Sequence, residues 1–365
     1  MRVVCKIGTS SITDAKGEIR VDAVEAFCAS IADVRAAGHV VVTVTSGAIA
    51  AGLPALGLDG DARPRDAQTL QAVSAVGQSR LMRVYDRAFE GLGLVSGQVL
   101  LAPLDFGVRQ QYLHARGTIR RLLELGVVPV VNENDAIADD EIRFGDNDRL
   151  AALVAHLVDA DVLVLLTDAP GLLTADPRLD PSASLIEEIV EVDHTLEAVA
   201  GGAGTVRGSG GMASKIAAAK MAAWSGVRVV IAGADRPGVL QDAVNGEAGV
   251  GTVVLPRERR LPARKLWIAF AVPARGTVLV DDGARHALCE RGRSLLPAGV
   301  VAAKGRFFAD DAVELAGPDE KVFAKGIVRA GSDVLGRIAG RRTDELPDGV
   351  PHEVVHRDDM VVLPA

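Results

Sequence analysis

Aromatic side chains are scarce in this chain, and basic residues are outnumbered by acidic ones. Aromatics make up only 3% of the 365 residues, so few rings are available to stack on nucleic acid bases. The formal net charge of -8 would in addition repel a phosphate backbone. Both features argue against nucleic acid as the leading partner.

Cysteines are equally few. Cys5, Cys28 and Cys289 are an odd number and show no Cys-x-x-Cys spacing. This pattern argues against a disulfide framework and against a zinc site. We therefore interpret all three as small hydrophobic residues.

Long apolar runs are missing as well. No run approaches the roughly 18 residues that a membrane-crossing helix needs. The amino-terminal residues MRVVCKIGTSS reach polar side chains too early for a secretory signal. We expect a soluble, cytoplasmic protein with no membrane partner.

Charge and composition divide the chain into two parts. Hydrophobic residues make up 48% of the sequence, which is enough for a conventional buried core. Residues 1–262 contain 25 Lys+Arg against 33 Asp+Glu, whereas residues 263–365 contain 15 of each. The polar, basic stretch Pro256–Lys265 between them has neither a helical nor a strand period, so it is interpreted as a linker. The sequence thus predicts a domain boundary near residue 260.

The first part alternates short β-branched runs with helical patterns. The helical patterns cover residues 22–37 and 70–92, and the apolar runs are VVCKI, VVVTVTS, GVVPVVNE, ADVLVLLTD and VRVVIAGA. Strands this apolar are typical of a parallel sheet that helices cover on both faces. We predict an α/β fold with a doubly wound, mostly parallel sheet. The second part has short strands and one helix near residues 284–291, which predicts a smaller β-rich domain.

Polar residues follow each of the five apolar runs. In an open parallel sheet, ligands bind beyond the carboxyl ends of the strands, so these residues are candidates for a binding site. Turn-forming residues also end strands for purely structural reasons, and for a single strand that alternative stays open. Lys6 is an exception, because a lysine inside a strand is costly to bury without an anionic partner. The candidates are Lys6, Gly8, Thr9, Ser10, Ser46, Gly47, Asn132, Glu133, Asn134, Asp135, Thr167, Asp168 and Gly233.

A glycine-rich loop, GSGGMASK at residues 208–215, precedes a helical pattern. Successive glycines can turn backbone N–H groups towards an anion, and Lys215 adds positive charge at the start of the helix. A flexible loop that merely caps the helix remains an equal alternative. The loop lacks the preceding strand of a dinucleotide fingerprint and the Gly-Lys-Ser/Thr of a Walker A motif.

The candidate site thus combines amides, hydroxyls and a glycine loop with two lysines and a carboxylate-rich segment. The lysines are Lys6 and Lys215, and the segment is Asp146, Asn147 and Asp148. Phosphoryl transfer needs little more than positioning, positive charge for the phosphate oxygens and carboxylates for Mg²⁺. These residues therefore favour a kinase outside the P-loop class.

Seven motifs in this order resemble the glutamate 5-kinase family, whose members have the amino acid kinase fold. They are CKIGTSSIT, TVTSGAIAAG, AVGQSRL, VVPVVNENDAIA, FGDNDRLAALVA, LLTDAPGLLTADPR and SGGMASKIAAA. Residues 276–353 are similar to the PUA domain that many bacterial members carry. The resemblance implies a catalytic domain over residues 1–258, an inter-domain segment over 259–274 and a PUA-like domain over 275–365.

The resemblance also implies the site. Lys6 and Lys215 would contact the transferring phosphoryl group, with Asp148 holding both lysines. The glutamate-binding residues would be Ser46, Gly47, Asn132, Asp135 and Asn147. The ATP-binding residues would be Lys6, Gly8, Thr167, Asp168, Ser209, Gly210, Gly211, Met212, Ala213, Ser214 and Lys215. Ser209 and Ala213 depart from the family pattern, the first with its hydroxyl preserved and the second without one.

The implied reaction is ATP-dependent phosphorylation of the L-glutamate side chain with Mg²⁺, the first step of proline biosynthesis. The residues that hold Mg²⁺ are not assigned. Family members are typically homo-oligomers, and many are inhibited by proline. The zero charge balance of the PUA-like part argues against RNA binding there. The alternatives are kinases of the same fold that act on acetylglutamate, aspartate or UMP, and an RNA-binding regulatory protein.

Overall fold

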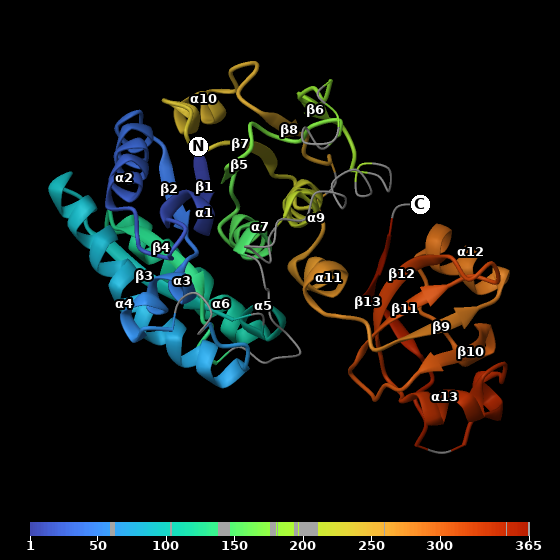
Figure 1. Cartoon of the computed structure of the whole chain (residues 1–365). Helices are drawn as coiled ribbons and strands as arrows, with labels where there is room; N and C mark the ends of the chain where they lie inside the picture. Colours follow the sequence, from blue (N-terminus) through green and yellow to red (C-terminus); the bar gives the residue numbers. More distant parts are fainter. Residues whose placement is uncertain are drawn as a thin grey trace. The chain divides into compact units, whose positions relative to one another are not determined.

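The computed structural model describes most of the chain (Figure 1). The described residues are 1–58, 63–102, 104–137, 147–175, 180, 182–192, 196, 211–258, 260–347 and 349–363. The chain divides into two compact units, Met1–Arg260 and Leu261–Ala365. None of the described helices is long and apolar enough to cross a membrane.

The first unit is built on an eight-stranded sheet with the order β3-β4-β2-β1-β5-β7-β8-β6. Every strand pair is parallel among the described residues except β7 with β8, so the predicted doubly wound, mostly parallel sheet is confirmed. The strands are β1 (Arg2–Ile7), β2 (Val40–Val44), β3 (Ser96–Leu101), β4 (Val128–Glu133), β5 (Val162–Thr167), β6 (Glu188–Ile189), β7 (Arg228–Gly233) and β8 (Thr252–Val254).

Helices cover both faces of this sheet. Side chains alternate along β1, so that Val3, Cys5 and Ile7 join a core with α2 (Val21–Ala36), α4 (Ala67–Gly91) and α10 (Val239–Asn245). Lys6 lies on the opposite face, which α6 (Arg109–Glu124), α7 (Asn147–Leu157) and α9 (Met212–Trp224) cover. The shorter helices are α1 (Thr9–Ile12), α3 (Ala48–Gly52), η1 (Pro54–Leu56) and α5 (Leu104–Gly107).

Two of the cysteines behave as small hydrophobic residues. Cys5 and Cys28 are buried in the first unit, and burial raises the pKa of the Cys5 thiol to about 12. Cys289 is exposed, so the interpretation as a buried hydrophobe is wrong for this residue. On α12 (Asp282–Arg291) the preceding Leu288 is the buried residue, and Cys289 lies beside it on the exposed part of the helix.

Helices α3 and α4 approach each other at two glycines. A Cβ on Gly77 would lie 1.8 Å from the carbonyl oxygen of Ala48 and 2.6 Å from the amide nitrogen of Gly52. A Cβ on Gly52 would lie 2.1 Å from the carbonyl oxygen of Val73. The glycine of the AVGQSRL motif therefore permits backbone contact between the two helices.

We expect Gly77→Ala to destabilise the protein by about 1–3 kcal/mol, because the added methyl group would force the packed backbones apart. Urea unfolding of the variant measures the change in free energy of unfolding. Gly91→Ala is the matched control, because it lies at the end of the same helix with nothing within 4 Å of the added atom. Equal stability of Gly77→Ala and the wild type would contradict the close approach.

The second unit is a five-stranded sheet with the order β10-β9-β11-β12-β13 and its own core. The strands are β9 (Gly276–Val280), β10 (Val300–Gly305), β11 (Ala312–Ala316), β12 (Val322–Val328) and β13 (Val355–Val362). The helical segments are α11 (Ala263–Leu266), η3 (Trp267–Ala271), α12 (Asp282–Arg291), η4 (Pro297–Gly299), α13 (Ser332–Ile338) and η5 (Thr343–Glu345). The smaller β-rich part that the sequence predicted is thus present.

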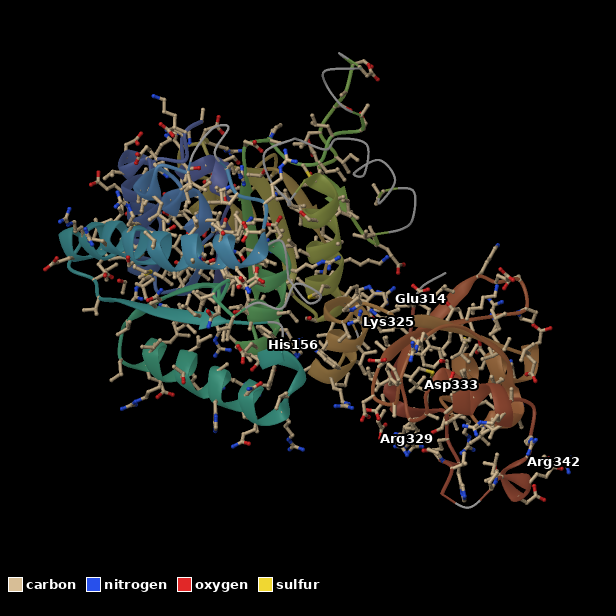
Figure 2. All side chains as sticks on the ribbon, turned by 60° about the horizontal axis from the view of Figure 1, so that its bottom comes forward. His156, Glu314, Lys325, Arg329, Asp333 and Arg342 are labelled. Carbon is tan, nitrogen blue, oxygen red and sulfur yellow. The ribbon has the colours of Figure 1, made fainter. Side chains whose placement is uncertain are left out.

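Residues 263–271 are helical, although the sequence showed no helical period up to residue 265. They are held within the second unit by Lys325, whose Nζ donates to the carbonyl oxygen of Ala269 at 3.4 Å and to that of Val272. Glu314 lies opposite Lys325 in the register of β11 and β12, and both are labelled in Figure 2. The inter-domain segment over 259–274 stays a prediction.

Candidate active site

Lys6 occupies a central position in the sheet. It lies in β1 opposite Val44 of β2 and Leu165 of β5, so hydrogen-bonded strands flank it on both sides. Only 5% of its side chain is exposed. The fold therefore holds this lysine on a rigid strand, one residue before the carboxyl end.

Asp148 joins this lysine to a second one. Its carboxylate lies at the start of α7, fully buried, with Oδ1 2.6 Å from Lys6 Nζ and Oδ2 3.1 Å from Lys215 Nζ. Lys215 lies in the first turn of α9, and 8% of its side chain is exposed. Ser214 Oγ also donates to Asp148 Oδ2 at 3.3 Å. Three elements that are distant in sequence thus converge on one carboxylate.

The electrostatics of this cluster favour the ionised carboxylate. Burial acts to raise the pKa of Asp148, but the two ammonium groups of Lys6 and Lys215 outweigh it and lower the pKa to about 2. Both oxygens of Asp148 are committed to the lysines. In the described contacts, two ammonium groups thus share one carboxylate.

The lowered pKa of Asp148 predicts that the free energy of unfolding depends on pH in the acid range. A carboxyl group whose pKa falls from 3.8 to about 2 on folding stabilises the protein above pH 3.8, and the contribution disappears as the pH falls through 2. The contribution is about 2 kcal/mol. We expect unfolding free energies measured by urea between pH 5 and pH 2 to fall by this extra amount in the wild type relative to Asp148→Asn. Parallel pH profiles would contradict the shift.

The residues expected to bind glutamate also come together in part. Asn147 Nδ2 donates to the Thr45 carbonyl at 2.6 Å and to Asn132 Oδ1 at 2.7 Å. Ser46 Oγ donates to the carbonyl of Ile7 at 3.2 Å, which places it beside the end of β1. Asp135 accepts a hydrogen bond from Ser74 of α4 at 3.0 Å.

Gly47 and Gly8 differ in what their backbones require. Gly47 has a φ of +94°, in the left-handed region that favours glycine, and it precedes α3. Gly8 has a φ of -80°, which any residue adopts, and a Cβ there would make only ordinary contact. Conformation thus explains the first glycine and not the second.

The residues expected to bind ATP lie along β1, β5 and α9. Thr167 ends β5 and donates from Oγ1 to Asp168 Oδ1 at 3.1 Å. Gly211 precedes α9, and Met212, Ala213, Ser214 and Lys215 form its first turn. Gly8 lies close to the Lys6 side chain, because a Cβ added at Gly8 would be 3.7 Å from Lys6 Nζ. Ser209 and Gly210 lie outside the described residues, as does Asp146.

The sequence did not predict the contribution of α4. Buried Gln78 accepts a hydrogen bond from Asn132 Nδ2 at 2.7 Å, and buried Tyr85 lies 2.9 Å from Thr45 Oγ1. Ser74, Gln78 and Tyr85 share one face of the helix at spacings of four and seven residues. The sequence signal that could have predicted these three residues is their helical spacing beside an apolar face.

No group of three metal-binding side chains occurs within the described ranges. The carboxylate of Asp148 is committed to two lysines, so its donor set does not suit a metal ion. The described residues therefore provide ammonium groups and backbone N–H groups for phosphates, but no cluster of protein ligands for Mg²⁺.

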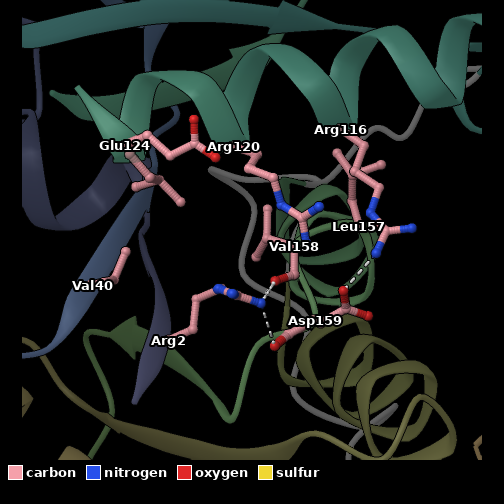
Figure 3. Close-up of a pocket in the computed structure, with 9 residues that line it drawn as sticks. Arg2, Val40, Arg116, Arg120, Glu124, Leu157, Val158 and Asp159 are labelled. Atoms are coloured by element: carbon pink, nitrogen blue, oxygen red, sulfur yellow. Dashed lines mark hydrogen bonds and ion pairs between the residues drawn. The ribbon is translucent and has the colours of Figure 1, made fainter. Parts of the chain in front are cut away.

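A cavity of about 260 Å³ lies at the other end of the sheet (Figure 3). It opens between α6 and the amino ends of the strands, beside Arg2 and Val40. Arg2 donates to the carbonyl of Asp159 at 3.2 Å, and Arg116 pairs with the Asp159 carboxylate at 2.7 Å. Ligands of parallel sheets bind at the carboxyl ends, so this cavity is separate from the candidate site.

Comparison with known proteins identifies the family. The profile described as "Amino acid kinase family" matches residues 1–233, and that of the PUA domain matches residues 276–350. A glutamate 5-kinase of Moorella thermoacetica is 44% identical over 366 residues, which cover 99% of this chain and 96% of that protein. The chain belongs to the glutamate 5-kinase family.

A second member of the glutamate 5-kinase family, from Rhodococcus jostii, is 46% identical over 361 residues, with 99% of this chain and 96% of that protein covered. Among solved structures, a carbamate kinase from Giardia lamblia bound to AMP-PNP superposes with a TM-score of 0.51 at 19% identity. This match covers 70% of the chain and 98% of that structure. The structural match supports the fold, and the sequence matches establish the membership in the glutamate 5-kinase family.

Proposed function

We propose that this protein transfers the γ-phosphoryl group of ATP to the side-chain carboxylate of L-glutamate, giving L-glutamyl 5-phosphate and ADP. The observation that carries the proposal is the buried Lys6–Asp148–Lys215 cluster at the carboxyl end of the sheet. The names of relatives that match almost the whole chain supply the substrate.

In this reaction, an oxygen of the glutamate carboxylate forms a bond to the γ-phosphorus, and the bond from that phosphorus to the bridging oxygen of ADP breaks. The nucleophile is already ionised at neutral pH, so no general base is needed. Negative charge is spread over the oxygens of the transferring phosphoryl group in the transition state. Lys6 and Lys215 would stabilise it from two sides, and Asp148 would hold both ammonium groups in place.

The remaining residues would orient the two substrates. Ser46, Gly47, Asn132, Asp135 and Asn147 would bind glutamate, with the Asp135 carboxylate suited to the substrate ammonium. Gly8, Thr167, Asp168 and the loop 209–215 would bind ATP. The backbone N–H groups at the start of α9 are suited to phosphates, because the amino end of a helix is electropositive.

Mg²⁺ would arrive with the nucleotide. This ion usually keeps several waters and binds substrate phosphates, so it does not require a cluster of protein carboxylates. Its role when bound would be to neutralise charge on the phosphates.

We further propose that the reaction is the first step of proline biosynthesis in the cytoplasm, with proline as a feedback inhibitor and the chain in a homo-oligomer. The catalytic domain would extend over residues 1–258, and the PUA-like domain over 275–365 would act in structure or regulation. RNA binding is not part of the proposal.

Release of ADP by the purified protein tests the proposal. Glutamate, acetylglutamate, aspartate and UMP serve as a panel of acceptors, and hydroxylamine traps any acyl phosphate that forms. We expect glutamate to give the highest turnover together with trapped product. Faster turnover of aspartate or UMP would overturn the assignment, and tRNA binding without ATP turnover would favour a regulatory protein.

A further inference from the structure

Helix α4 has a buried polar face that contacts the carboxyl end of the sheet. Ser74 Oγ donates to Asp135 Oδ2 at 3.0 Å, and Gln78 accepts from Asn132 at 2.7 Å. Tyr85 lies 2.9 Å from the hydroxyl of Thr45. Each of these residues lies next to or within the proposed glutamate site. Helix α4 therefore supports that site without contributing a residue that the family resemblance assigns to it.

The amides of this region form a chain of hydrogen bonds with a fixed direction. Asn132 Oδ1 accepts from the backbone N–H of Glu133 at 2.9 Å, and Asn147 Nδ2 donates to the backbone carbonyl of Thr45 at 2.6 Å. A backbone N–H can only donate and a backbone carbonyl can only accept. These two contacts therefore settle which atom of each amide is oxygen and which is nitrogen.

The donor and acceptor roles of Asn132 also determine the orientation of the Gln78 amide. With Asn132 Oδ1 committed to Glu133 and Asn147, Asn132 Nδ2 is the donor in its contact with Gln78, and the Gln78 atom facing it must be the oxygen Oε1. Gln78 Nε2 is buried and has no hydrogen-bond partner among the described residues. A reversed Gln78 would set two donors against each other. Asn132 and Gln78 are only 1% and 8% exposed, so water has little access to replace either partner.

These hydrogen bonds determine whether Asn147 can donate to a substrate or accept from it. Both N–H groups of its side chain are used, one by Thr45 and one by Asn132. Only the oxygen Oδ1 remains, and it is an acceptor. The group of glutamate that matches an acceptor is the ammonium, because both carboxylates of glutamate are acceptors themselves.

We propose that Gln78 is a positioning residue that holds the side chain of Asn132 in place, and through it Asn147, so that Asn147 Oδ1 recognises the α-ammonium of the substrate. This inference rests on the proposed function and deepens it. Gln78 would act on the substrate through Asn132, its hydrogen-bond partner. Its effect is on selection between glutamate and dicarboxylates of the same length that lack the ammonium.

The experiment compares L-glutamate with glutarate, which has the same two carboxylates and no ammonium. The measured quantity is the ratio of their kcat/KM values, and where glutarate turnover is too slow, the ratio of its Ki to the KM of glutamate. In Gln78→Leu we expect this ratio to fall about tenfold, because Asn132 Nδ2 loses its buried acceptor and with it the hydrogen bond that holds the amide pair in position. The KM for ATP should stay unchanged.

Two further variants separate positioning from general structure. Gln78→Glu keeps an acceptor for Asn132 Nδ2, so it should keep the ratio within about threefold. Gln68→Leu makes the same change as Gln78→Leu on an exposed part of the same helix and should leave the ratio unaltered. If Gln78→Leu does not fold, Gln78→Met carries the same expectation with an unbranched side chain of similar length.

Each outcome bears on one proposal. A folded Gln78→Leu variant with the wild-type ratio overturns the inference, and so does an equal loss of activity on both substrates. The wild-type protein must first turn over glutamate. A wild-type protein that does not phosphorylate glutamate would overturn the proposed function itself. A lower glutamate-to-glutarate ratio in Gln78→Leu is interpreted only when the wild type is active, so the two failures are distinguishable.

Discussion

Lys215→Ala is expected to lower kcat by about 10²- to 10³-fold while the KM for glutamate changes little. Lys215 lies 3.1 Å from Asp148 and is buried, so its ammonium group is largely shielded from solvent. Its proposed contact with the phosphoryl oxygens would strengthen as charge develops, so the loss should fall mainly on the transition state. Steady-state ADP release at varied glutamate and ATP measures both constants.

Lys220→Ala provides the control for this experiment, because Lys220 lies on the same helix and is not part of the cluster. It should keep kcat within about twofold, since it contacts none of the reacting groups. An unchanged kcat in Lys215→Ala would remove this lysine from the mechanism, and a selective rise in KM would assign it to binding alone.

Asp148→Asn is expected to have the second large effect, on activity and on stability together. The change keeps the size of the side chain but leaves two buried ammonium groups without a counter-charge. We expect kcat to fall by about 10³-fold as the lysines lose their positions, and the free energy of unfolding to fall by about 3–5 kcal/mol. ADP release and urea unfolding at pH 7 measure the two effects.

The matched control is Asp159→Asn, which removes a carboxylate paired with Arg116 on the surface. The side chains of this pair are 44% and 36% exposed, so we expect a loss of less than about 1 kcal/mol. Asp159 has a φ of +51°, which asparagine tolerates well. Similar losses in both aspartate variants would show that burial of the cluster contributes nothing to stability.

The sequence predicted the central part of the first unit because its strands are buried on both faces. The runs around Lys6, Asn132 and Thr167 coincide with β1, β4 and β5, and the polar residues after them lie at one end of the sheet. Parallel strands make such prediction possible, because continuous apolar runs identify them and their carboxyl ends meet at one edge.

Other elements gave weaker signals. Strand β3 lies at the edge of the sheet and is only partly buried, and α6 buries Ile119 alone among its apolar side chains, so neither has a strong apolar pattern. Gln78 was not predicted as part of the site because its role depends on Asn132, 54 positions away. Hydrogen bonds between elements distant in sequence leave no local periodicity.

The pairing of one aspartate with two lysines has a consequence for the protein before any substrate arrives. The side chains of Lys6 and Lys215 are only 5% and 8% exposed and share one carboxylate, so their positive charge is poorly solvated and an entering phosphate would help to neutralise it. Part of the attraction for nucleotide would thus come from positive charge that the protein solvates incompletely. Binding of ATP should accordingly raise the free energy of unfolding of the protein.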